Sequence, residues 1–173
     1  MSTNAWHYTI GERLPAIFES GELRPSDSHI ANGEKPILWF STRPDFEPTA
    51  TKMGLSVDGS YRGLSVKETE QEGGGLFRFG VSIDRVTSWP RIGSLAGIKT
   101  KIKKSLEDVG IRKGASPRQW YGSLDPIPIH EMSLEWLSDG GDWVDHMHHP
   151  FFATLETLEP SPAPEGAHPK QDV

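Results

Sequence analysis

The chain has 173 residues, of which 35% are hydrophobic, and a formal net charge of −6. This length suits one domain with a core of its own, and the acidic balance argues against general nucleic-acid binding. The absence of cysteine excludes disulfides, zinc–thiolate sites and thiol nucleophiles.

The N-terminal part of the chain predicts a strand, a helix and a second strand. Residues 6–10 alternate polar and apolar side chains, which is typical of a strand. Apolar residues recur at spacings of three and four over residues 14–18, and this pattern predicts a helix that Gly21 ends. The near-continuous apolar run at residues 37–41 predicts a strand buried on both faces.

The middle of the chain combines an irregular segment with a third strand. Residues 47–75 are rich in Ser, Thr, Gly and Glu and end in three glycines, so we expect a surface insertion or a mobile loop. In the strand predicted at residues 76–83, Phe77 and Phe79 share the core face. Arg78 then points to the opposite side, toward solvent or a cleft, and the Trp-Pro dipeptide at 89–90 ends this unit.

An amphipathic helix is predicted in the second half of the chain. Residues 98–109 carry apolar side chains at helical spacing, and we expect Gly110 to end the helix. Its lysine cluster is followed directly by Glu107 and Asp108. A solvated helix face is therefore the preferred interpretation, and contact with phosphate or nucleic acid is the alternative.

Short extended segments follow this helix. Prolines favour an extended conformation at residues 126–129, alternation predicts a last strand at 132–137, and a hairpin-type turn is expected at 139–142. Residues 159–173, rich in proline, alanine and charge, predict a disordered tail. The pattern as a whole predicts a single α+β domain over residues 1–158.

Common catalytic and metal-binding motifs are absent. The sequence has no GxGxxG after a strand, no GxSxG, no HExxH and no Walker A motif. The run Asp-His-Met-His-His at residues 145–149 offers imidazoles, but these are adjacent rather than spaced along one helix face. We interpret it as a polar loop and expect no metal.

His7 is the one histidine in a predicted core strand, and by itself it reads as a buried histidine bonded to backbone groups. It is followed by Tyr8 and Thr9, then by the predicted helix that Gly21 ends, then by Leu-Trp-Phe-Ser-Thr at residues 38–42. This order resembles the ADP-ribosyltransferases. It is most similar to the branch that includes DNA-modifying toxins and RNA 2′-phosphotransferases.

The resemblance implies a small mixed or antiparallel split sheet with a few helices, and NAD as the substrate. His7 would hold a ribose of NAD, and an aromatic ring of Tyr8 or Trp39 would stack on nicotinamide, a flat cation that gains from an aromatic face. Arg78 would contact phosphate or the target. The other residues that the resemblance assigns to the pocket are Thr9, Phe40, Ser41 and Thr42.

The resemblance also implies a glutamate shortly before an extended Ile-Pro segment. It would stabilise the positive charge that develops on the ribose as nicotinamide leaves. The matching stretch, residues 119–128, contains no glutamate. Gln119 can bond a ribose but supplies no charge, and Asp125 lies in the turn. Glu131 and Glu135 come later, and Glu131 is the leading acidic candidate.

Three functions remain open from the sequence. The first is an NAD-dependent ADP-ribosyltransferase acting on a protein, a nucleic acid or a small molecule. The second is a non-catalytic nucleotide- or protein-binding module on the same fold, and the third is an unrelated α+β protein whose tryptophans form an interaction surface. Without a signal-peptide pattern or an apolar run near the roughly 18 residues that span a bilayer, we expect a soluble, cytoplasmic protein.

Overall fold

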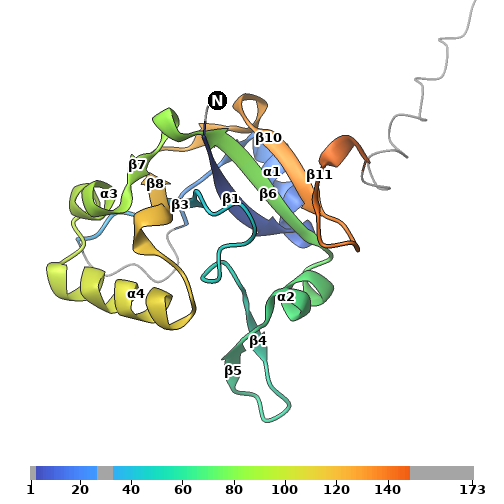
Figure 1. Cartoon of the computed structure of the whole chain (residues 1–173), viewed down its shortest axis with the longest axis horizontal. Helices are drawn as coiled ribbons and strands as arrows, with labels where there is room; N and C mark the ends of the chain where they lie inside the picture. The colour runs from blue at the N-terminus through green and yellow to red at the C-terminus, as the bar shows by residue number, and fades with distance from the viewer. Residues whose placement is uncertain (1–2, 27–32, 149–173) are drawn as a thin grey trace, which may run out of the picture.

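A seven-stranded sheet organises the chain (Figure 1). The computed structural model describes residues 3–26 and 33–148, so the tail predicted at 159–173 lies outside the described residues. The helices are α1 (Leu14–Ser20), α2 (Val66–Glu72), α3 (Trp89–Leu95) and α4 (Thr100–Arg112). The strands of the large sheet are β1 (Asn4–Ile10), β3 (Leu38–Ser41), β6 (Leu76–Ser82), β7 (Thr87–Ser88), β8 (Trp120–Ser123), β10 (Ser133–Leu137) and β11 (Trp143–Asp145).

The strand order in this sheet is β11-β10-β6-β1-β3-β8-β7, and every pairing between described strands is antiparallel. The predicted α+β class with an antiparallel sheet is therefore confirmed. β1 pairs with β6 along its whole length, from Asn4↔Ser82 to Ile10↔Leu76. On its other side β1 shares a single pair with β3, Trp6↔Ser41. The two halves of the sheet thus separate beyond that pair.

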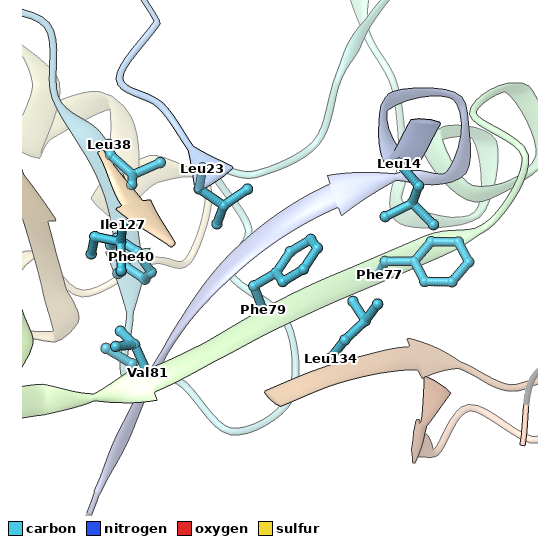
Figure 2. Packing of buried hydrophobic residues seen from close by; sticks show 10 residues of the cluster. Leu14, Leu23, Leu38, Phe40, Phe77, Phe79, Val81, Ile127 and Leu134 are labelled. Atoms are coloured by element: carbon cyan, nitrogen blue, oxygen red, sulfur yellow. The ribbon is translucent and has the colours of Figure 1, made fainter. Parts of the chain in front are cut away.

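The main core lies on one face of the sheet, under α1 and the short pair β2 (Glu22–Leu23) and β9 (Ile127–Pro128) (Figure 2). Phe77, Phe79 and Val81 of β6 are buried there, as the alternation along that strand predicts. The other labelled members of the cluster are Leu14, Leu23, Leu38, Phe40, Ile127 and Leu134.

The expectation that Arg78 faces solvent or a cleft is wrong. Arg78 is 7% exposed, and its guanidinium lies 3.9 Å above the Trp6 ring and 4.3 Å from the Trp143 ring. Its Nε donates to Glu135, its register partner on β10, at 2.7 Å. This face of the sheet is covered by aromatic rings, and a flat guanidinium with a carboxylate partner suits such a site.

Two other segments differ from the sequence prediction. The Trp-Pro dipeptide at 89–90 begins α3 instead of ending a unit, because proline is well accommodated in the first helical turn. The segment 47–75 contains an arm, β4 (Met53–Leu55) paired with β5 (Tyr61–Gly63), that projects from the body in Figure 1. It also contains α2, which begins with a capping box of Ser65 and Glu68.

α4 runs through Gly110, where the sequence predicts its end. Gly110 is buried, and a Cβ atom added there would overlap the ring of Trp120. Trp120 belongs to a second buried cluster with Trp89 and Ile92. The glycine therefore allows close approach of helix and indole. No helix within the described ranges is long and apolar enough to cross a membrane.

We expect Gly110→Ala to destabilise the protein by about 1–3 kcal/mol, because the added Cβ would overlap the Trp120 ring and force α4 or the packed cluster of Trp120 to shift. A loss of stability would be informative, because in an isolated helix alanine is about 1 kcal/mol more favourable than glycine. Urea unfolding measures the difference. The control is Gly63→Ala, where a Cβ meets open space, and equal or higher stability of Gly110→Ala would contradict this packing.

Candidate functional site

The site begins where β1 and β3 separate. Beyond the pair Trp6↔Ser41, the side chain of His7 bridges the two strands, with Nδ1 2.9 Å from the carbonyl oxygen of Trp39. A carbonyl oxygen only accepts hydrogen bonds, so this geometry assigns the proton of the neutral imidazole to Nδ1. Nε2 is then an acceptor that can serve a ligand.

His7 is neutral at physiological pH. Burial lowers its pKa to about 4, against the opposing effect of the hydrogen bond to Trp39, and the positive charge of Lys52 lowers it further. Its ring packs 5.8 Å from that of Phe40, centroid to centroid. The imidazole is thus held from two sides in one tautomer.

A pocket of about 460 Å³ opens at this position, a size typical of small-molecule sites. Its walls come from β1, β3, the chain after β3, the C-terminal half of α4 and the start of β8. The lining residues are Trp6, His7, Tyr8, Trp39, Phe40, Ser41, Glu47, Thr49, Ala50, Thr51, Lys52, Leu106, Val109, Gly110, Lys113 and Trp120.

Trp39 gives the pocket a flat apolar surface. Trp39 is 39% exposed, yet the centroid of its ring lies 5.2 Å from that of Trp89 and 6.5 Å from that of Trp120. Contact with buried indoles fixes the orientation of the exposed ring. Such a surface suits stacking of a planar ligand, and a cationic ring gains most from it.

Glu47 is a pocket residue that the sequence analysis missed. It is 5% exposed, and its Oε2 accepts a hydrogen bond from Ser41 Oγ at 2.8 Å. Its Oε1 accepts from Thr49 Oγ1 at 2.7 Å and from the Thr49 amide at 3.3 Å. Within the described ranges, Glu47 has no ion-pair partner within 4 Å. The irregular composition of the surrounding segment gives no periodic signal of this burial.

The chain just before Glu47 is fixed by three side chains from one face of the sheet. Each donates a hydrogen bond to one of three consecutive carbonyl groups. The bonds are Tyr8 Oη to Arg43 at 3.1 Å, Arg78 to Pro44 at 2.6 Å and Trp143 Nε1 to Asp45 at 2.5 Å. Burial raises the pKa of Tyr8 to about 12, so its hydroxyl remains a donor. This anchoring sets the position from which Glu47 enters the pocket.

The structure brings most of the residues that the resemblance assigned to NAD into one place. His7, Tyr8, Trp39, Phe40 and Ser41 all line the pocket. Thr9 is buried and Thr42 is partly buried, and the pocket lining includes neither of them.

The remaining predicted residues lie elsewhere. Gln119 directly precedes the pocket residue Trp120, and its carbonyl accepts from the amide of Thr42 at 2.9 Å. Glu131 is exposed and forms an ion pair with Arg85. The pair of Arg78 and Glu135 packs against the anchored chain outside the pocket lining.

Comparison with known proteins finds no relative: no family model, no curated protein and no solved structure matches the chain. In the part of the chain that the structure describes, no group of three or more His, Asp or Glu side chains is arranged to hold a metal ion. His149, from the histidine run at 145–149, lies outside the described residues. Fold and site together define an α+β protein with a ligand-sized pocket at the opening of its central sheet.

The lowered pKa of His7 predicts a specific pH dependence of stability. Between pH 6.5 and about 4 the unfolded chain binds a proton at His7 that the folded protein does not bind, so stability rises with pH across this window. From pH 7 to pH 4, the wild type should lose about 3 kcal/mol more than His7→Gln. Urea unfolding at pH 4, 5, 6 and 7 measures this difference, and parallel pH curves would contradict it.

Proposed function

We propose that this protein binds NAD in the pocket and transfers its ADP-ribose to a protein, nucleic-acid or small-molecule acceptor. The observation that carries the proposal is the neutral His7 imidazole, bonded to the Trp39 carbonyl where β1 and β3 separate. Its Nε2 can accept from a ribose hydroxyl. This is the role that the resemblance to ADP-ribosyltransferases assigns to the histidine.

The pocket also suits the nicotinamide ring. Trp39 is 39% exposed and lines the same pocket as His7, so one ligand can stack on the indole and bind the imidazole through its ribose. Oxidised nicotinamide is a flat cation, and it gains from both an aromatic face and a nearby carboxylate. Among the lining residues, Trp39 is an exposed aromatic residue and Glu47 carries a carboxyl group.

Lys52 and Lys113 supply the positive charge that a diphosphate requires. Both line the pocket, and lysine is a common partner of phosphate groups in proteins. Burial lowers the pKa of Lys52, and an anionic ligand would favour its charged form.

A second candidate is a module that binds the nucleotide without turnover. It is favoured by the position of the acidic residues that the resemblance put forward. Glu131 is paired with Arg85 and Glu135 with Arg78, and neither lines the pocket. Binding of NAD without release of nicotinamide would select this candidate.

We expect His7→Ala to weaken NAD binding about tenfold or more, because the ribose loses its acceptor in a partly buried site. Calorimetric titration measures the affinity, and chromatography measures nicotinamide release. The matched control is His130→Ala, which removes an exposed imidazole outside the pocket. A wild type that does not bind NAD at millimolar concentration, or a folded His7→Ala that binds as the wild type does, would refute the proposal.

A further inference from the structure

We infer that Glu47 is the anionic group that faces the positive charge of nicotinamide ribose, and that the pocket therefore selects the oxidised, cationic form of the dinucleotide. This inference rests on the proposed function and assigns a role to a residue outside the resemblance. It is carried by the burial of Glu47, by its neutral hydrogen-bond partners and by the way its position is fixed.

The first argument is electrostatic. A buried carboxylate loses much of its hydration, and proteins normally compensate this loss with a cation. Glu47 instead receives hydrogen bonds from Ser41 and Thr49, which are neutral. Lys52 and Lys113 line the same pocket, yet neither forms an ion pair with Glu47 among the described residues. Within the described residues the carboxylate therefore has hydrogen-bond donors but no ion-pair partner within 4 Å, and a cationic ligand would supply one.

The second argument is positional. Ser41, which binds Glu47, and Trp39, whose carbonyl binds His7, are two residues apart on β3. This spacing corresponds to about 7 Å along a strand, and residues i and i+2 share one face of it. Trp39, His7 and Glu47 also line one pocket. We therefore place the nicotinamide ring on Trp39 and its ribose between His7 and Glu47.

The third argument is preorganisation. Three hydrogen bonds from Tyr8, Arg78 and Trp143 fix the chain at residues 43–45, two residues before Glu47. Hydroxyl and amide donors then orient both carboxylate oxygens. A charge held in this way need not reorganise when a ligand binds, which is the condition under which fixed charges are most effective.

The same placement serves the transfer step. The bond between ribose C1′ and the nicotinamide nitrogen breaks, and its electron pair stays on nitrogen, so nicotinamide leaves as a neutral molecule. The positive charge moves to C1′ and the ring oxygen of the ribose. A hydroxyl or amine of the acceptor, or a water molecule, forms the new bond to C1′ and releases its proton to solvent. Glu47 faces the positive charge before and after it moves.

The test compares NAD⁺ with NADH, which has nearly the same shape but a neutral nicotinamide ring. We expect the wild type to bind NAD⁺ about tenfold more tightly than NADH, because only NAD⁺ offers a charge to Glu47. Glu47→Gln keeps the size of the side chain and should bring the two dissociation constants within about twofold, mainly by weakening NAD⁺. Calorimetry measures both constants, and Glu12→Gln, at an exposed glutamate outside the pocket, is the matched control.

Equal affinities in the wild type, or an undiminished preference for NAD⁺ in folded Glu47→Gln, would overturn the inference and leave the proposed function standing. A wild type that binds neither dinucleotide would refute the proposed function, and this inference with it. If Glu47→Gln does not fold, the ratio of the wild-type dissociation constants for NADH and NAD⁺ still tests the inference. Nicotinamide release by folded Glu47→Gln should be about a hundredfold slower than by the wild type, and an equal rate would count against Glu47.

Discussion

The central constraint of this structure is the early end of the ladder between β1 and β3. Two strands at the centre of a sheet normally pair along their length, because unpaired backbone groups are costly when buried. Here a single residue pair is followed by the hydrogen bond from the His7 ring to the Trp39 carbonyl. The side chain satisfies the acceptor and holds the strands apart at the same point. The pocket and the partly exposed Trp39 lie at this opening, and burial lowers the pKa of His7 beside it.

The face of the sheet that carries Trp6, Tyr8 and Arg78 also supports this opening. Arg78, stacked between Trp6 and Trp143 and paired with Glu135, fixes the chain that leaves β3. That chain continues to Glu47. One strand therefore provides both the acceptor for His7 and the route by which a carboxylate reaches the pocket. The positions of His7 and Glu47 therefore both depend on the path of β3 and of the chain that follows it.

Much of the fold can be predicted from the sequence, because the patterns that indicate its strands and helices involve neighbouring residues. Alternation along residues 76–83 predicts the core face of β6, and the helical spacing after residue 98 predicts α4. The burial of Arg78 cannot be predicted in this way, because its partner Glu135 lies 57 positions away in the sequence. The two residues become neighbours only through the register of β6 and β10. The sequence directs attention to His7, but the contact with Trp39 depends on how far β1 and β3 pair. Glu47 escapes prediction because its burial depends on the anchoring of the preceding carbonyls by three distant side chains.

The central claim is that the opening between β1 and β3 is a nucleotide site. A crystal structure of the protein with a non-hydrolysable NAD analogue tests it most directly. The account predicts that the nicotinamide ring stacks on Trp39 and that a ribose hydroxyl lies within hydrogen-bonding distance of His7 Nε2, with the Nδ1 bond to Trp39 retained. An analogue bound elsewhere on the protein, with the pocket holding only solvent at saturating concentration, would contradict it.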